Sequence, residues 1–341
     1  MSFTQVILPH RPTVDRVGAY VIFEQAAKRS LDVVFAHQGM LISDQELSGL
    51  VEKGTFPIGV GKGRTYRERE VDGQNFGSET SLIIHELRSI GGIGEDAVLD
   101  DFAKMMDRNN KDGYLVNQQF SVNKIVRHAY HIGCDPKMVV RSSAHVISVF
   151  LEARRIELTN GLSLGVRDRA NEIASTVLAY LPETARIHNG AMSVQRYIRD
   201  MALVEVTEET MVSNMMLWLG IRDQAKVRQV AAKKIADTQR FPTFQLDRRS
   251  ERGVWLESDD IFLMNELVFR CSLVVMRGSG GNIVIMSKRF RLDGIAAALM
   301  ERETDWYYEP FQHNVLANEI RTTLSREELE HCVGTAVLTQ R

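Results

Sequence analysis

The apolar residues in roughly the first ninety positions follow two different spacings. Short apolar runs typical of buried strands occur at 5–8, 31–36 and 56–61. Residues 16–28 and 78–88 instead carry apolar side chains at the spacing of a helix that covers a sheet. Strands and helices in this order form right-handed crossovers and predict an α/β fold with a parallel sheet. In such a sheet a functional site lies at the carboxyl ends of the strands.

The pattern changes twice further along the chain. From about residue 95 to residue 240 it is mostly helical, and Ala170, Ile173 and Val177 share one helical face. Beyond it, β-rich runs at 271–276 and 282–286 flank a Gly-rich loop and predict a hairpin. The sequence therefore predicts three parts: a parallel-sheet α/β domain at 1–150, a helical segment at 151–245 and a smaller α+β domain at 246–341.

Two helix starts are predicted from local capping residues. Asp44 is a good N-cap for a short helix between the second and third strands. Near the C-terminus, Ser325 followed by Glu327 and Glu328 has the composition of a capping box. These residues place helix starts after 44 and after 325.

Composition narrows the classes of function without choosing one. The 341 residues include 42 Lys plus Arg and 44 Asp plus Glu, for a formal net charge of −2. This balance excludes nucleic-acid binding through bulk positive charge but leaves a local basic groove open. Three cysteines without a CxxC pair fit a reducing compartment. Since the N-terminus lacks a signal-peptide pattern and no apolar run reaches the ~18 residues of a membrane span, we expect a cytoplasmic chain with no membrane contact.

Two residues in the first strand-to-helix turn have side chains that bind metals. His10 and Asp15 lie between the strand at 5–8 and the helix at 16–28, at the carboxyl edge of the predicted sheet. Imidazole and carboxylate together suit Mn²⁺, Fe²⁺ or Zn²⁺ better than Ca²⁺. The alternative is structural: Asp15 caps the helix that follows it, and His10 is a surface loop residue.

Two further aspartates are candidates for the same site. Asp72 lies in a turn before the helix at 78–88, and Asp107 lies near the end of a helix. Each also has a structural explanation, since Asp beside Gly favours a turn and Asp at a helix end favours a cap. A separate pair, His128 and His131, shares one helical face and is a weaker candidate for metal binding.

The order of these motifs resembles the DHH phosphoesterase superfamily. The segment HRPTVDRVGAYV resembles its first strand-to-helix turn. The segment IGVGKGRTYREREVDGQNFGSETSLI resembles its strand, VG loop and Asp-containing turn, and FAKMMDRNN resembles the segment of its later Asp. The resemblance covers about residues 5–115 and is one of pattern rather than identity. It implies a DHH-like domain at 1–150 and a metal-dependent, nuclease-like hydrolase of phosphodiesters that acts on a nucleotide or a nucleic-acid end.

The resemblance also implies roles for individual residues. His10, Asp15, Asp72 and Asp107 would bind Mn²⁺ or Mg²⁺, and Asp15 and Asp72 would take part in catalysis. In this superfamily two such ions activate a water molecule and neutralise the phosphate oxygens. The resemblance therefore predicts a metal-binding hydrolase.

Lys62 and Arg64 are candidate phosphate-binding residues. They alternate with Gly61 and Gly63, so flexible backbone amides and two cations could surround an anion. The segment does not match GxxxxGK[ST], which excludes a P-loop, and the alternative is an exposed turn. Two other groups of basic residues are either solvated faces or nucleic-acid contacts. They are Lys226, Arg228, Lys233, Lys234 and Arg240, then Lys288, Arg289 and Arg291.

The chain departs from the superfamily at three positions. Gly59 replaces an Asp expected to bridge the two metals, and Gly73 and Gln74 replace two histidines. Neither Gly nor Gln substitutes for imidazole on a transition metal. Two hypotheses follow: a divergent metal-dependent phosphoesterase, or a catalytically degenerate DHH-like protein that acts as a binding or assembly module. A homo-oligomer is compatible with either.

Overall fold

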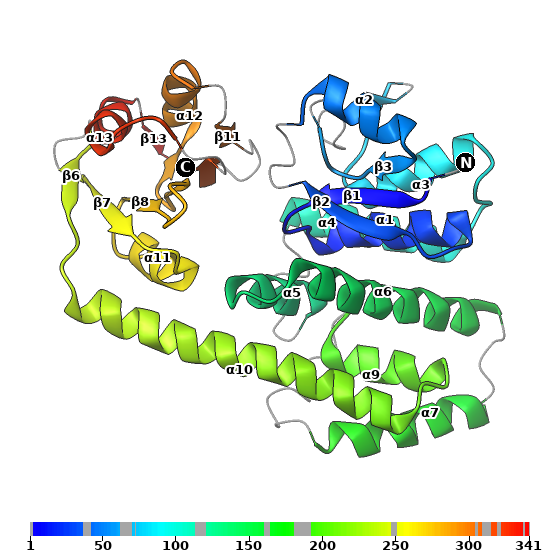
Figure 1. Cartoon of the computed structure of the whole chain (residues 1–341). Coiled ribbons are helices and arrows are strands. Elements are labelled where there is room, and N and C mark those ends of the chain that lie inside the picture. The colour runs from blue at the N-terminus through cyan, green and yellow to red at the C-terminus, as the bar shows by residue number, and fades with distance from the viewer. Residues whose placement is uncertain are drawn as a thin grey trace. The chain divides into compact units, whose positions relative to one another are not determined.

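The structure, a computed structural model, describes residues 3–36, 42–61, 70–71, 73–112, 121–159, 164–180, 192–246, 251–303, 306–308, 315–318, 322–336 and 338–340. The chain divides into two compact units, Met1–Gln224 and Ala225–Arg341. Its elements confirm a mixed α/β chain rich in helix, with a small parallel sheet in the first unit and a mixed sheet in the second (Figure 1).

The parallel sheet of the first unit has the strand order β2-β1-β3. These strands are β1 (Gln5–Pro9), β2 (Asp32–Ala36) and β3 (Thr55–Pro57). Val6 of β1 is in register with Val33 on one side and Phe56 on the other. Helix α1 (Val14–Ala27) connects β1 to β2, so the crossover predicted from the apolar spacing is confirmed. The carboxyl end of β1 leads directly into the turn that contains His10.

The two faces of this sheet are covered by different helices. Side chains alternate across a strand, and Val6 and Leu8 belong to the large core that also contains Val17 of α1. Ile7 points to the opposite face and packs in a smaller cluster with Leu50 of α2 (Asp44–Glu52). The short apolar strands are therefore buried on both faces, as their nearly continuous apolar sequence predicts.

Helix α2 begins one residue away from the expected cap. The N-cap is Ser43 rather than Asp44: the Ser43 hydroxyl accepts a hydrogen bond from the Glu46 amide over 3.3 Å. The Glu46 carboxylate in turn accepts a bond from the Ser43 amide over 3.1 Å. This reciprocal capping box satisfies two N–H groups at the helix start, which a cap at Asp44 would not do.

The remaining helices of the first unit pack on the same core as the sheet. Helix α6 contacts α1, α4, α5 and α9, and α7 contacts α9 (Figure 1). Helix α6 runs continuously through residues 150 and 151, the predicted limit between the first two parts of the chain. These helices are α3 (Glu79–Ser89), α4 (Ala97–Asp112), α5 (Val122–His131), α6 (Pro136–Thr159), α7 (Leu164–Leu178), α9 (Val194–Leu203) and α10 (Glu208–Thr238), the last extending into the second unit.

A short hairpin precedes α3 in the first unit. Strands β4 (Glu70–Val71) and β5 (Gln74–Asn75) are antiparallel, and Val71 is paired with Gln74. Gly73 in their connection has φ +76°, a left-handed conformation that favours glycine. Backbone geometry therefore accounts for glycine at this position.

The second unit is built on a sheet with the order β11-β12-β9-β8-β7-β6. Only β7 and β8 are parallel among these strands, and the other neighbours are antiparallel. The hairpin predicted around the Gly-rich loop is confirmed as β8 and β9, with Met276 in register with Val284. The strands are β6 (Thr243–Gln245), β7 (Arg252–Glu257), β8 (Leu273–Arg277), β9 (Ile283–Met286), β11 (Tyr307–Tyr308) and β12 (Val315–Asn318).

Three helices and a two-stranded ladder complete the second unit. The helices are α11 (Ile261–Val268), α12 (Asp293–Met300) and α13 (Arg326–Thr335), and β10 (Phe290–Arg291) pairs with β13 (Thr339–Gln340). The predicted capping box at the start of α13 is confirmed between Ser325 and Glu328. No helix in the described part of the chain is long and apolar enough to cross a membrane.

Candidate functional site

The structure brings two of the predicted site residues to the start of helix α3. Asp15 lies in the first turn of α1, and Asp107 lies on α4. His10 lies at the carboxyl end of β1, half-buried, with its ring 6.3 Å from that of Phe35 and nearly perpendicular to it. The other predicted site residues, Asp72, Lys62 and Arg64, lie outside the described residues.

The carboxylate of Asp15 is buried and accepts three hydrogen bonds. The backbone amides of Glu79 and Thr80 donate to its Oδ2 and Oδ1 over 2.9 and 3.0 Å. The Asn110 side chain donates to Oδ2 over 2.9 Å. The first amides of a helix have no partner within the helix and carry partial positive charge, which a carboxylate stabilises. Asp15 therefore caps α3, while its own helix α1 has Thr13 as N-cap without a side-chain cap bond.

The carboxylate of Asp107 lies at the same helix start. The Ser78 hydroxyl donates to Asp107 Oδ1 over 2.5 Å, and the Ser81 hydroxyl donates to the same oxygen. Ser78 is the N-cap of α3, and its hydroxyl accepts a bond from the Ser81 amide over 3.0 Å. Asp107 thus supports the residue that caps α3. A Cβ atom at Gly77 would lie 2.7 Å from Asp107 Cγ, so glycine there allows the carboxylate to approach.

Asn110 links Asp15 to the segment that precedes α3. Its amide donates to Asp15 Oδ2 and to the Gly77 carbonyl oxygen, the latter over 3.1 Å. Asn110 lies one helical turn after Asp107 on α4, which places both side chains on the same face. Sequence reasoning identified the two aspartates but missed Asn110, Gly77 and Ser78, although the N-cap signal of Ser78 is visible in the sequence.

Gly59 lies close to an arginine and a glutamate. A Cβ atom at this position would be 2.5 Å from Arg16 Nε and 3.1 Å from Glu79 Oε1. Gly59 has φ +63°, so an L side chain would also be strained there. Arg16 and Glu79 therefore occupy the space into which the superfamily's Asp side chain would project.

The donor set of the described residues does not fit the two-metal centre that the resemblance implies. A carboxylate has about four lone-pair directions, and three of those on Asp15 are directed at N–H donors. A metal ion at Asp15 would compete with the amides that begin α3. Among the described residues, no group of three or more His, Cys, Asp or Glu side chains is arranged as metal ligands.

The weaker candidate pair, His128 and His131, is half-buried on α5. Burial, with a smaller contribution from nearby cations, lowers the pKa of each imidazole to about 4. The cations are Lys124 and Arg127 for His128, and Arg127 and Arg11 for His131. Both rings are therefore neutral at pH 7. A cationic neighbourhood opposes the binding of a metal cation by this pair.

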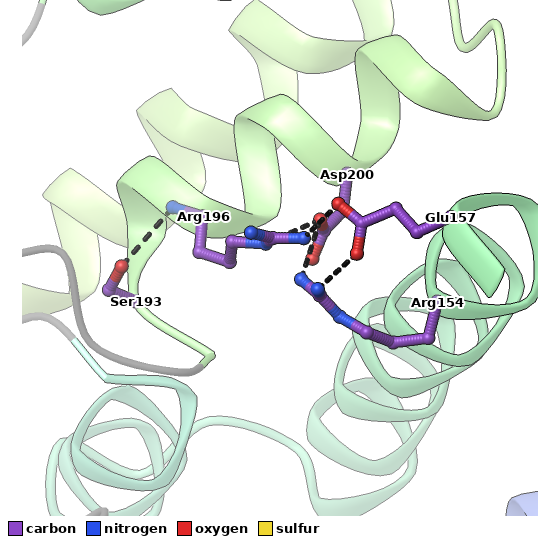
Figure 2. A network of polar contacts seen from close by, with 5 residues as sticks. All are labelled: Arg154, Glu157, Ser193, Arg196 and Asp200. Atoms are coloured by element: carbon purple, nitrogen blue, oxygen red, sulfur yellow. Dashed lines mark hydrogen bonds and ion pairs between the residues drawn. The ribbon is translucent and has the colours of Figure 1, made fainter. Parts of the chain in front are cut away.

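A second polar cluster, centred on the buried Asp200, joins helices α6 and α9 (Figure 2). Arg196 donates to Asp200 Oδ1 over 2.7 Å through Nε and to Glu157 Oε1 over 2.7 Å. Arg154 is paired with Glu157 and lies 3.4 Å from Asp200 Oδ1. The Asp200 side chain is 1% exposed, and burial raises its pKa while Arg154 lowers it. Since the four side chains face one another, this cluster joins two helices rather than lining a site.

Comparison with known proteins does not assign the chain to a family. No protein-family model matches the chain, and no curated protein matches it. A solved structure described as an uncharacterized protein from Helicobacter pylori G27 aligns over 96% of this chain and 95% of that one, with 9% identity and a TM-score of 0.20. A similarity this low carries no argument about fold or function.

Proposed function

We propose that this chain is a catalytically degenerate protein with a DHH-like N-terminal scaffold that acts as a binding or assembly module. The observation that carries the proposal is the position of Asp15, whose carboxylate accepts the first two amides of α3 and the Asn110 side chain. The resemblance to the DHH superfamily implies that this residue is a metal ligand. Here it stabilises a helix start, which is a structural role that needs no ion.

The departures from the superfamily pattern support the same proposal. At Gly59 the expected bridging carboxylate is replaced by a glycine with φ +63°, and Arg16 lies within 2.5 Å of where its Cβ would be. At Gly73 an expected histidine is replaced by a glycine with φ +76°. A cation beside the position of a metal ligand opposes metal binding by Coulomb repulsion. At both positions the backbone conformation therefore favours glycine over the expected metal ligand.

One observation favours the alternative, a divergent phosphoesterase. Asp15 and Asp107 come from different helices and both lie at the start of α3. Together with Asp72 and His10, these carboxylates would hold Mn²⁺ or Mg²⁺, which would supply an activated water for hydrolysis of a nucleotide or a nucleic-acid end, and Lys62 and Arg64 would contact the phosphate. That reaction requires Asp15 to exchange amide donors for a cation.

The experiment that separates the two functions measures metal binding and turnover on the same preparation. The full chain is tested in EDTA, in Mn²⁺ and in Mg²⁺ for its melting temperature and for hydrolysis of bis(p-nitrophenyl) phosphate and a 5′-labelled oligonucleotide. We expect no metal-dependent rise in melting temperature and no turnover above that of an Asp72→Asn variant prepared in parallel. Turnover that requires Mn²⁺ and is lost in Asp72→Asn would overturn the proposal and establish the hydrolase.

A further inference from the structure

A cavity of about 300 Å³ lies in the first unit, beside the edge strand β3. It is lined by residues of α1, α2, β3 and α3 together with Phe3, and those elements are labelled in Figure 1. We propose that this cavity binds a small aromatic amine: a single ring against the phenylalanine wall and an ammonium group at Glu86. Its volume is at the lower end of the range for small-molecule sites, about 300 to 1,000 Å³, which favours a one-ring ligand.

One wall of the cavity is aromatic. The rings of Phe23 and Phe56 are stacked with their centroids 4.0 Å apart and 19° between their planes. The ring of Phe3 meets that of Phe56 edge-on at 5.2 Å and 75°. Phe23 is buried, whereas Phe3 and Phe56 are partly accessible and line the cavity. A further ring can extend this array in an edge-to-face or offset arrangement, which aromatic pairs prefer.

Another part of the lining is one face of α3. Glu79, Ile83, Glu86 and Ile90 follow each other at spacings of three or four residues and all line the cavity. Ile90 is 53% exposed at the end of this row, while Ile83 is buried. This part of the lining is therefore apolar along most of its length, with a carboxylate in each half.

The charge of the lining selects the charge of the ligand. The described residues that line the cavity include two carboxylates, Glu79 and Glu86, and no Lys, Arg or His. Glu79 is 1% exposed, and its Oε1 and Arg16 Nε both lie next to Gly59, so this carboxylate is the less accessible of the two. Glu86 is half-buried between apolar residues, where an ammonium ion is attracted more strongly than in water.

This inference does not depend on the proposed function. The cavity follows α3 from Glu79 to Ile90, and neither Asp15 nor Asp107 lines it. The same cavity could bind this ligand whether or not the protein hydrolyses phosphodiesters. The test below measures ligand binding and not turnover, so its failure leaves the proposed function unchanged.

The experiment compares three probes of similar size and different charge. Binding of 2-phenylethylamine, 2-phenylethanol and 3-phenylpropanoate to the full chain is measured by isothermal titration calorimetry. We expect the amine to bind, the alcohol to bind about tenfold more weakly and the carboxylate not to bind. Equal affinity for all three probes, or no binding of the amine at millimolar concentration, would overturn the proposal without the use of any variant.

Two variants then locate the site. Glu86→Gln keeps the size of the side chain. It should lower the affinity for the amine about tenfold and leave the affinity for the alcohol unchanged. Glu152→Gln removes an exposed carboxylate of α6 that does not line the cavity, and it should change neither affinity. If the two variants bind the amine equally, the ammonium group is not at Glu86 and the assignment is wrong.

Discussion

Thr80 donates two hydrogen bonds to Asp15, although 65 positions separate the two residues in the sequence. The Thr80 amide donates to Asp15 Oδ1 over 3.0 Å, and the Thr80 hydroxyl donates to the Asp15 carbonyl oxygen over 3.0 Å. The pair joins the first turn of α1 to the first turn of α3. A residue that the sequence marks as a candidate metal ligand is thereby part of a contact between two helix starts.

The first prediction concerns the carboxylate of Asp15. An Asp15→Asn substitution should lower the free energy of unfolding by about 2 to 3 kcal/mol, because the new NH₂ group faces N–H donors and leaves at least one of them buried without an acceptor. Urea denaturation of the full chain in EDTA measures this change. The loss should be the same in Mn²⁺, since the carboxylate binds amides rather than an ion.

Asp32→Asn is the matched control for this prediction. Asp32 is an exposed carboxylate at the start of β2, so its loss should change the stability by no more than about 0.5 kcal/mol. A destabilisation by Asp15→Asn that occurs only in the presence of Mn²⁺ would show that the residue is a metal ligand.

The fold of the first unit was largely accessible from the sequence because its signals are local. The apolar runs at 5–8 and 31–36 are strands that two covering layers bury, and this burial gives the nearly continuous apolar pattern. The boundary of α2 was less accessible. Asp44 and Ser43 are both good N-caps, and the choice depends on Glu46, three residues after Ser43, which completes the capping box.

The candidate site was less predictable because its contacts are non-local. Asp15 lies in the first turn of α1, and this position indicates a cap for that helix. Its actual partners, Glu79 and Thr80, are brought to it only by the packing of α1 against α3. The proximity of Arg16 to Gly59 is equally non-local, so no spacing rule within one segment could predict either contact.

The second prediction restores the superfamily's carboxylate at position 59. Gly59→Asp should lower the free energy of unfolding by about 1 to 2 kcal/mol, because the residue has φ +63° and its Cβ would meet Arg16. We also expect Mn²⁺ to leave the melting temperature of this variant unchanged, because the new carboxylate would pair with the Arg16 guanidinium. Gly59→Ala has the same backbone strain without the charge and is the control. Stabilisation by Mn²⁺ of the Asp variant alone would contradict this account.

The third prediction concerns acid stability through His128 and His131. Their pKa values are near 4 in the folded chain and about 6.5 in an unfolded one. Between these values the unfolded state binds more protons, so stability is complete above pH 6.5 and falls as the pH decreases toward 4. At about 1.4 kcal/mol per pKa unit, the two shifts together set an upper bound of about 7 kcal/mol. The partial exposure of both rings reduces this bound, so we expect the pair to contribute a decrease of a few kcal/mol over this interval.

Urea denaturation at several pH values checks the contribution of the two histidines. A His128→Gln/His131→Gln variant has no imidazole to protonate, so its stability should depend less steeply on pH between 6.5 and 4. Carboxylates titrate in both proteins, and the difference between the two curves isolates the histidines. Parallel curves would mean that the imidazoles are as easily protonated in the folded chain as in the unfolded one.

The fourth prediction compares a buried ion pair with an exposed one. Arg196 Nε lies 2.7 Å from Asp200 Oδ1, whose side chain is 1% exposed (Figure 2). Arg222 and Asp223 are 2.6 Å apart, but the Asp223 side chain is 60% exposed. Arg196→Ala should lower the free energy of unfolding by about 3 kcal/mol or more, because it leaves the buried Asp200 carboxylate with one cation fewer. Arg222→Ala should cost no more than about 1 kcal/mol, since water solvates the carboxylate that remains. Urea denaturation of both variants measures the two costs, and equal losses would show that burial of the cluster between α6 and α9 does not determine its energy.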